Sequence, residues 1–138
     1  MEELPEWNAV MGLQLENLIL NNVQELYSLL HLEHIPVLSA APFRKQDART
    51  GGCQIDLLIQ TRKSVFVVEI KRKREIGEEV ESEVSRKVAR LSIRKDKSVR
   101  TVLVYDGNLH PIVRSNAYFD ALIDIADLMK QGVCPECR

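Results

Sequence analysis

Two acidic side chains and a lysine interrupt a pair of apolar runs in the middle of the chain. Asp56 lies within CQIDLLIQ (53–60), and Glu69 and Lys71 lie within SVFVVEIK (64–71). Both runs are short and rich in Val, Ile and Leu, so we predict two strands joined by a tight turn. Because side chains alternate between the two faces of a strand, Glu69 and Lys71 should share one face.

The charges of the two strands meet if the strands form a hairpin centred between residues 62 and 63. In that register Asp56 lies directly across from Glu69, and Gln54 lies across from Lys71. Directly opposed side chains have Cβ atoms about 4.5–5.5 Å apart, and like charges at that distance destabilise a sheet. A divalent cation would offset the repulsion, since Mg²⁺ accepts one or two carboxylates together with water.

A third carboxylate is predicted on the helix that precedes these strands. Residues 8–30 contain no proline, and their apolar residues recur at helical spacing. Glu16 lies on the apolar stripe of this helix, where a carboxylate needs a partner or a polar cavity. With Asp56 and Glu69 it would complete a one- or two-metal site. Such a site polarises a phosphodiester, activates a water molecule and neutralises charge on the phosphorus oxygens.

The remaining pattern predicts a single α/β domain over residues 1–131, with 132–138 as a flexible tail that carries Cys134 and Cys137 in CxxC spacing. The segment IPVLSAAPF reads as an edge strand, because Pro42 cannot donate to a central ladder. The expected order is α-β-β-β-α-β-(β)-α around a central mixed sheet of four to five strands flanked by helices. After the two charged strands we expect a helix over about 75–91, a strand RTVLVYD that turns at DGN, an optional strand at HPIV, and a last helix over about 116–131.

Composition limits the class of protein. The chain has 138 residues and a formal net charge of −1, but residues 71–100 carry eleven Lys or Arg against six Asp or Glu. A basic block of this kind permits a polyanionic partner without requiring one. No apolar run approaches the roughly 20 residues of a membrane span, and we expect no membrane association. Three cysteines fit a reducing compartment, so the expected location is the cytoplasm.

These residues and their order resemble the PD-(D/E)XK phosphodiesterase superfamily, which has a restriction-endonuclease-like core. The matching elements are QID (54–56), EIK (69–71), a preceding helix with Glu16, and an amphipathic helix after the second motif. More narrowly, MGLQLENLIL, GGCQIDLLIQ and VVEIKRKREIG look similar to the nuclease-like C-terminal domain of many predicted archaeal and bacterial ATPases. Two features depart from the superfamily pattern. Ile55 stands where the motif has proline, and the second helix lacks the Gln-x-x-x-Tyr signature of RecB-type members.

The resemblance implies a role for each matched residue. Asp56, Glu69 and Glu16 would be metal ligands. The carbonyl of Ile70 would be a further ligand of the cofactor, Mg²⁺, for which Mn²⁺ could substitute. Lys71 would orient or activate the attacking water and stabilise the transition state. Auxiliary polar groups would come from Gln54, Glu83 and Lys87.

The basic run KRKR (71–74) is predicted to leave the second strand and enter the following helix. There Arg72, Lys73 and Arg74 could hold phosphates beside the metal, and such contacts position a nucleic acid without reading its sequence. A solvated junction between strand and helix explains the same run equally well.

Three hypotheses follow. The first is a Mg²⁺-dependent nuclease that hydrolyses DNA phosphodiester bonds with Asp56, Glu69 and Lys71. The second is a catalytically silent module of the same fold that binds nucleic acid or an ATPase partner; its DNA binding would be salt-sensitive and would survive Asp56→Ala. The third is an assembly domain in which the strand charges form buried ion pairs. A homodimer is compatible with each of them.

Overall fold

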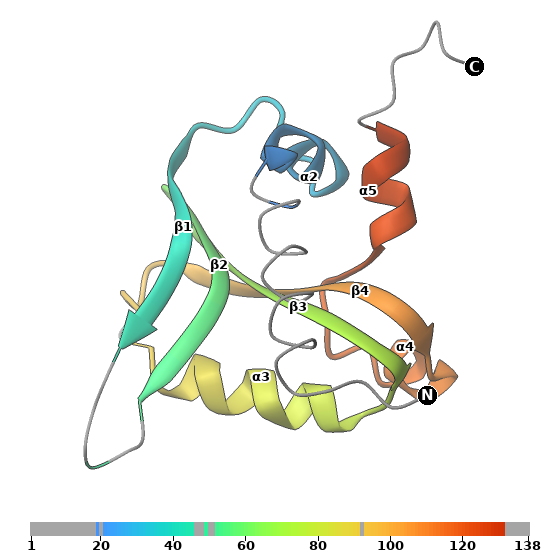
Figure 1. The fold of residues 1–138 in the computed structure, drawn as a ribbon. Coiled ribbons are helices and arrows are strands. Elements are labelled where there is room, and N and C mark those ends of the chain that lie inside the picture. The colour runs from blue at the N-terminus through green and yellow to red at the C-terminus, as the bar shows by residue number, and fades with distance from the viewer. Residues whose placement is uncertain (1–18, 20, 46–48, 50–51, 92, 132–138) are drawn as a thin grey trace, which may run out of the picture.

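A five-stranded mixed sheet with helices on both faces forms the centre of the molecule (Figure 1). The structure is a computed structural model, and it describes residues 19, 21–45, 49, 52–91 and 93–131. Its α/β architecture agrees with the general class predicted from the sequence. In chain order the described elements are α2 (Val23–Leu29), β1 (Val37–Lys45), β2 (Cys53–Thr61), β3 (Ser64–Ile76), α3 (Glu79–Ala89), β4 (Ser98–Leu109), α4 (Pro111–Asn116), β5 (Ala121–Asp124) and α5 (Ile125–Gln131).

The strands lie across the sheet in chain order, from β1 at one edge to β5 at the other. β1, β2 and β3 pair antiparallel, whereas β3, β4 and β5 pair parallel. α3 lies in the long connection that a parallel β3–β4 pair requires. Two predictions are confirmed here. β1, with its Pro42, is an edge strand, and the pairs Leu57↔Val68 and Gln60↔Val65 follow the predicted hairpin register.

Each face of the sheet has its own apolar core. The face covered by α3 and α4, here called the α3 face, buries Val65 and Val67 of β3 against Val84 of α3. The opposite face, here called the α2 face, buries Val68 in a core with Leu26 of α2. Figure 1 shows α3 and α4 on one side of the sheet and α2 and α5 on the other. Burial on both faces explains why the central strands are nearly continuous apolar runs.

A β-bulge interrupts β2 opposite Pro42. Between the pairs Ala41↔Leu58 and Phe43↔Ile55, Pro42 alone faces two residues of β2. Proline has no N–H to donate to the ladder, so its position is a natural break in the pairing. A bulge re-aims the side chains of the longer strand and bends it.

The bulge makes part of the predicted strand parity wrong. Strict alternation would place Cys53 and Ile55 on the same face as Leu57. In the structure Cys53 and Ile55 belong to the α3-face core, whereas Leu57 belongs to the α2-face core. Gln54 lies between two residues of the α3 face and is exposed, so it is directed towards the α2 face.

The basic run KRKR does not enter a helix, contrary to the prediction. β3 continues through it to Ile76, because β4 supplies a parallel partner as far as Leu109. The predicted turn at DGN is also absent, and these residues form part of β4. A β-bulge interrupts the β3–β4 ladder there, because Lys73 and Arg74 of β3 both lie opposite Gly107 of β4. Gly107 has a φ of 145° and lies so close to the carbonyl oxygen of Lys73 that a Cβ would collide with it.

The last third of the chain differs most from the prediction. HPIV begins helix α4 instead of forming a strand, since Pro111 occupies its first turn and the His110 side chain accepts a hydrogen bond from the Ile112 N–H. Residues 121–124 form β5 beside β4, and helix α5 begins only at Ile125. None of the described helices is long and apolar enough to cross a membrane.

Candidate functional site

Five charged side chains from β2, β3 and α3 meet on the α3 face. We call them the carboxylate–lysine cluster: Asp56, Glu69, Lys71, Glu83 and Lys87. The sequence predicted the first three from strand pairing, and the resemblance added the last two. Because three carboxylates face two ammonium groups, the cluster has a formal charge of −1 when all five side chains are ionised.

Glu69 lies at the centre of the cluster and is only 2% exposed. The Nζ of Lys87 donates to both of its carboxylate oxygens, at 2.8 and 3.1 Å, and the Nζ of Lys71 lies 3.7 Å away. A buried carboxylate needs such partners, since desolvation of an unpaired charge costs several kcal/mol. Glu69 is therefore held in one position by cations from its own strand and from α3.

α3 contributes Glu83 and Lys87 because of their spacing. The two residues are four apart, so they lie on one side of the helix, beside the buried stripe of Val80 and Val84. The carboxylate of Glu83 forms an ion pair with the Nζ of Lys71 at 2.6 Å. The helix thus carries a carboxylate for the strand lysine and a lysine for the strand carboxylate.

Asp56 reaches across to the main chain of β3. Its Oδ2 accepts a hydrogen bond of 2.9 Å from the N–H of Ile70. The described β2–β3 pairs end at Leu57↔Val68, so this carboxylate takes the place of a ladder acceptor just beyond them. Among the described residues, no hydrogen bond to its Oδ1 is found.

The environment raises the pKa of both strand carboxyls. Burial is the largest cause for Asp56, although the Ile70 N–H, Lys87 and Lys71 act in the opposite direction. For Glu69, burial and then the charge of Asp56 raise the pKa, and the two lysines again oppose the shift. The two carboxylates therefore lack full compensation by the described residues, and a further cation would stabilise their ionised forms.

Lys71 is held in its protonated form. Burial, the largest single influence, lowers its pKa, but the hydrogen bond to Glu83 and the charges of Glu69, Glu83 and Asp56 together raise it above the ordinary value. A lysine with a raised pKa is a poor proton acceptor at neutral pH. In this arrangement Lys71 acts as a fixed positive charge.

The donor chemistry of the cluster fits Mg²⁺. Asp56 and Glu69 present hard oxygen donors from neighbouring strands, and Mg²⁺ is commonly held by one or two carboxylates with water completing its shell. Among the described residues no group of three or more His, Cys, Asp or Glu could hold a metal ion together. A cation shared by Asp56 and Glu69 would compete with the Lys87 ammonium for Glu69. Glu16, the predicted third carboxylate, lies outside the described residues.

Several predicted auxiliary residues are not brought to the cluster. Gln54 accepts a hydrogen bond of 3.1 Å from Arg44 of β1. Arg72 pairs with Asp106 at 3.4 Å, and Lys73 pairs with Glu79 at 3.3 Å. Arg74 is exposed on β3 and has no hydrogen-bond or ion-pair partner among the described residues. These cations line the outer end of β3, and only Lys71 of the KRKR run belongs to the cluster.

Sequence reasoning missed the bulge opposite Pro42, whose two β2 residues are Asp56 and Leu57. The signal was present, because a proline in an edge strand predicts a break in the ladder. It did not show which residues of β2 would lie opposite the break. That pairing depends on how far the loop between β1 and β2 carries the chain before it returns.

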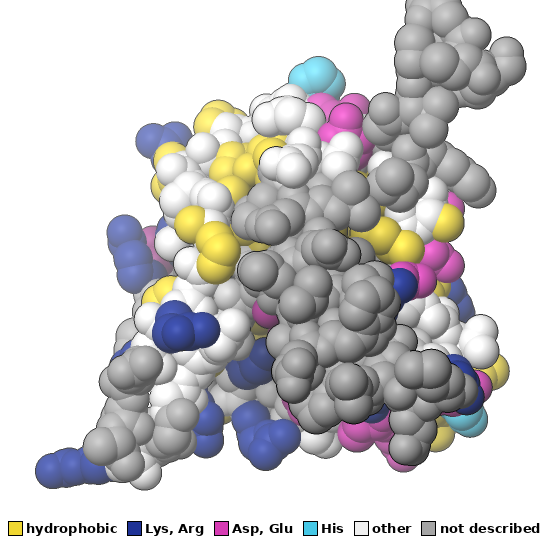
Figure 2. Space-filling model, viewed as in Figure 1, with side chains coloured by type: hydrophobic (Ala, Val, Ile, Leu, Met, Phe, Trp, Pro, Cys, Tyr) yellow, Lys and Arg dark blue, Asp and Glu magenta, His cyan; other side chains and the backbone are white. Residues whose placement is uncertain are grey.

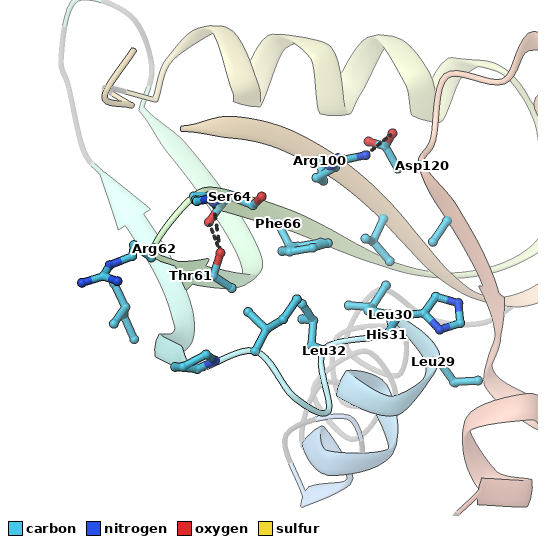
Figure 3. A pocket seen from close by; sticks show the side chains of 16 residues that line it. Leu29, Leu30, His31, Leu32, Thr61, Arg62, Ser64, Phe66, Arg100 and Asp120 are labelled. Atoms are coloured by element: carbon cyan, nitrogen blue, oxygen red, sulfur yellow. Dashed lines mark hydrogen bonds and ion pairs between the residues drawn. The ribbon is translucent and has the colours of Figure 1, made fainter. Parts of the chain in front are cut away.

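A hollow on the α2 face is lined by none of the cluster residues (Figure 3). This α2-side groove has a volume of about 900 Å³ and lies between the end of α2, the β2–β3 turn and the beginnings of β4 and β5. Leu30, Leu32 and Phe66 give it an apolar lining. Its charged lining residues are Arg62, Lys63, Arg100 and Asp120, and the last two lie 3.9 Å apart.

Comparisons with known proteins do not supply a function for this chain. No protein-family model, no curated protein and no solved structure matches it. Its function is therefore inferred from the geometry of its own side chains.

Proposed function

We propose that this protein is a metal-dependent phosphodiesterase that hydrolyses DNA, with a restriction-endonuclease-like core of the PD-(D/E)XK type. The observation that carries the proposal is the meeting of Asp56, Glu69 and Lys71 on adjacent strands. One buried and one partly buried carboxyl, both with raised pKa values, are costly beside a charged lysine in a purely structural role. The same arrangement suits a cation and a phosphate bound side by side.

In this proposal Asp56 and Glu69 hold Mg²⁺, and the carbonyl of Ile70 is a further candidate ligand. The bound ion supplies Lewis-acid polarisation of the phosphodiester and a more acidic water molecule. The Lys71 ammonium stabilises negative charge that develops on the phosphorus oxygens. Glu83 holds that ammonium in place through the 2.6 Å ion pair.

This assignment narrows the role expected for Lys71. The resemblance implied that Lys71 orients or activates water and also stabilises the transition state. Its raised pKa favours the second of these roles, charge stabilisation, over proton abstraction. Lys71→Arg keeps the charge, so we expect it to retain more activity than Lys71→Met. Equal inactivity of the two variants would return Lys71 to a role that depends on its amine.

The direct test is cleavage of plasmid DNA by the purified chain in Mg²⁺ or Mn²⁺. Asp56→Asn and Lys71→Met should each lower the rate at least about 100-fold, since each removes a group from the reacting centre. Lys73→Met is the matched control, because Lys73 lies on the same strand, two residues further on, and pairs with Glu79 in solvent. If all variants cleave at the same rate, the activity belongs to a contaminant and the proposal fails.

A second candidate is a catalytically silent module that binds nucleic acid or an ATPase partner. The position of Lys87 favours it, because one ammonium already contacts both oxygens of Glu69. Titration calorimetry with Mn²⁺ separates the two candidates. Heat of binding that is lost in Glu69→Ala supports the hydrolase. No heat of binding in the wild type, with DNA present, supports the silent module.

A further inference from the structure

The α3 face carries a second, smaller hollow beside the carboxylate–lysine cluster. This α3-side hollow has a volume of about 280 Å³ and lies between β1, β2 and the connection that follows α3. Phe43, Leu58 and Val65 line it from the sheet, and Leu91 and Ile93 line it from the connection. Gln60 and three cations, Lys45, Arg94 and Lys97, complete its lining.

The hollow and the cluster are close along the strands. Leu58 lies two residues after Asp56, and Val65 lies four residues before Glu69 on the same face. At a rise of about 3.3 Å per residue, these separations are about 7 and 13 Å along the strands. A nucleic-acid strand with one phosphate at the cluster would therefore reach the hollow with the next one or two nucleotides.

Hydrogen bonds fasten the end of α3 to the beginning of β2, next to the hollow. Arg90 donates to the carbonyl of Gly52 at 2.6 Å, and the thiol of Cys53 donates to the carbonyl of Lys87 at 3.6 Å. Cys53 pairs in turn with Lys45 of β1. Lys45 of the hollow and Lys87 of the cluster are thus both joined to Cys53 at the beginning of β2.

The hollow combines an apolar lining with cations. Of its three cations only Arg94 has an acidic partner among the described residues, Asp96 at 2.9 Å. Phe43 is the single aromatic residue of the lining. A nucleotide matches both properties, since its base has an apolar face that stacks on aromatic rings and its phosphate is anionic. In a duplex the base faces are stacked on one another, so only an unpaired nucleotide can offer its base.

We propose that the α3-side hollow binds an unpaired nucleotide next to the phosphodiester held at the cluster. The preferred substrate is then single-stranded or splayed nucleic acid, and a continuous duplex is disfavoured. The inference builds on the proposed function for the position of the phosphodiester, but binding in the hollow does not depend on hydrolysis.

Binding is measured by fluorescence anisotropy in EDTA, with labelled DNA of about 12 nucleotides as a single strand and as the matching duplex. We expect the single strand to bind at least tenfold more tightly. The double variant Lys45→Ala/Lys97→Ala should weaken single-strand binding at least tenfold. Phe43→Leu should weaken it about 5- to 100-fold, the range expected for the loss of one stacked base.

The matched control is Arg62→Ala/Lys63→Ala, which removes the same charge from the α2-side groove. It should change single-strand binding less than threefold. Equal losses in the two double variants would show unspecific attraction of a polyanion and would overturn the proposal. Duplex binding as tight as single-strand binding, or equally tight binding of polyglutamate, would also overturn it. Lys45 is exposed and Lys97 partly exposed, so a folded double variant keeps the test decisive if Phe43→Leu loses stability.

The two proposals fail separately. If single-strand binding depends on Phe43 and Lys45 but no DNA is cleaved in Mg²⁺ or Mn²⁺, the hollow is assigned correctly and the hydrolase is wrong. If DNA is cleaved and the hollow variants bind and cut both forms like the wild type, the hydrolase stands and the hollow is wrong.

Discussion

The α2-side groove and the α3-side hollow are lined by almost the same chemistry but lie on opposite faces of the sheet. Each is lined by one phenylalanine and three cations: Arg62, Lys63 and Arg100 on one face, and Lys45, Arg94 and Lys97 on the other. Arg100 pairs with Asp120, which also lines the groove, and Arg94 pairs with Asp96, which lies outside the lining of the hollow. The groove on the α2 face is about three times larger. Size and charge alone would therefore favour the α2-side groove as the nucleotide site, whereas we propose the α3-side hollow. Proximity to the carboxylate–lysine cluster distinguishes the smaller one.

Figure 2 shows Lys and Arg side chains scattered over the region of β1 and the nearby end of α3 in that view. Contacts between such cations and phosphates position a nucleic acid without reading its sequence. In the proposed hydrolase the reacting phosphate also needs groups in fixed positions, and the cluster would supply these because Glu69 is buried and Lys71 is paired. The scattered cations would thus position the nucleic acid as a whole, whereas the cluster would fix the phosphate that reacts.

The largest expected effect is loss of hydrolysis when Asp56 is changed. Asp56→Asn keeps an acceptor for the Ile70 N–H but removes the charge, so DNA cleavage should fall at least about 100-fold. Arg100→Gln on the α2 face should leave the rate within about twofold. The measurement is the initial rate of plasmid nicking in Mg²⁺. A similar loss in both variants would remove the distinction between the faces.

A large loss of stability is expected when Lys87 is changed. Lys87→Met leaves the buried carboxylate of Glu69 without its closest cation, and breaking a buried pair in this way costs about 3 kcal/mol or more in the free energy of unfolding. Arg100→Gln breaks the exposed pair with Asp120, which should cost less than about 1 kcal/mol. Denaturation in urea near neutral pH measures both. Equal changes in the free energy of unfolding would show that the ion pair of the cluster contributes no more to stability than the exposed pair.

A smaller effect of opposite sign is expected for Asp56→Asn on stability. The pKa of Asp56 is raised by burial, so the folded state binds the proton more tightly than the unfolded chain. Wild-type stability should therefore fall as the pH rises from about 4, the unfolded pKa, through the folded pKa. Asp56→Asn removes this fall and should be more stable by about 0.5–2 kcal/mol at pH ~8.

The same pair of proteins tests cation binding. The stability difference should shrink as the pH falls towards ~4 and vanish below the unfolded pKa, at pH ~2–3, where Asp56 is protonated in both states. Mg²⁺ at pH ~8 should raise the melting temperature of the wild type and leave that of Asp56→Asn nearly unchanged, since a ligand of the folded state stabilises it. A variant that is less stable than the wild type at pH ~8 would contradict the assigned direction of the pKa shift.

The smallest effect is expected at Pro42. Pro42→Ala restores an N–H opposite the β2 bulge and permits a regular ladder, which would turn Asp56 away from Ile70. We expect DNA cleavage to fall about 3- to 10-fold, because misplacement by a fraction of an ångström weakens catalysis. Pro36→Ala, in the lining of the α2-side groove, is the control and should have no effect. An unchanged rate in Pro42→Ala would show that other contacts hold the bulge.

Local pattern was sufficient for the central hairpin. Two apolar runs joined by a short turn have few ways to pair, and the predicted register is the one observed from Leu57↔Val68 to Gln60↔Val65. The pattern was insufficient after Tyr105. The strand over Ala121–Asp124 depends on a partner, β4, that comes nearly twenty residues earlier, and the apolar spacing there also suited a helix. KRKR stays in β3 for the same reason, because β4 runs beside it.

By itself the sequence determined the edge position of β1, the register of the β2–β3 hairpin and the common face of Glu69 and Lys71, because these follow from proline chemistry and the two-residue period of a strand. Only the tertiary structure decided that Gln54 turns away and that Glu83 and Lys87 close the cluster from α3. It also decided which of two similar hollows adjoins the cluster. These features depend on a bulge and on packing between segments distant in the chain, which no local period encodes.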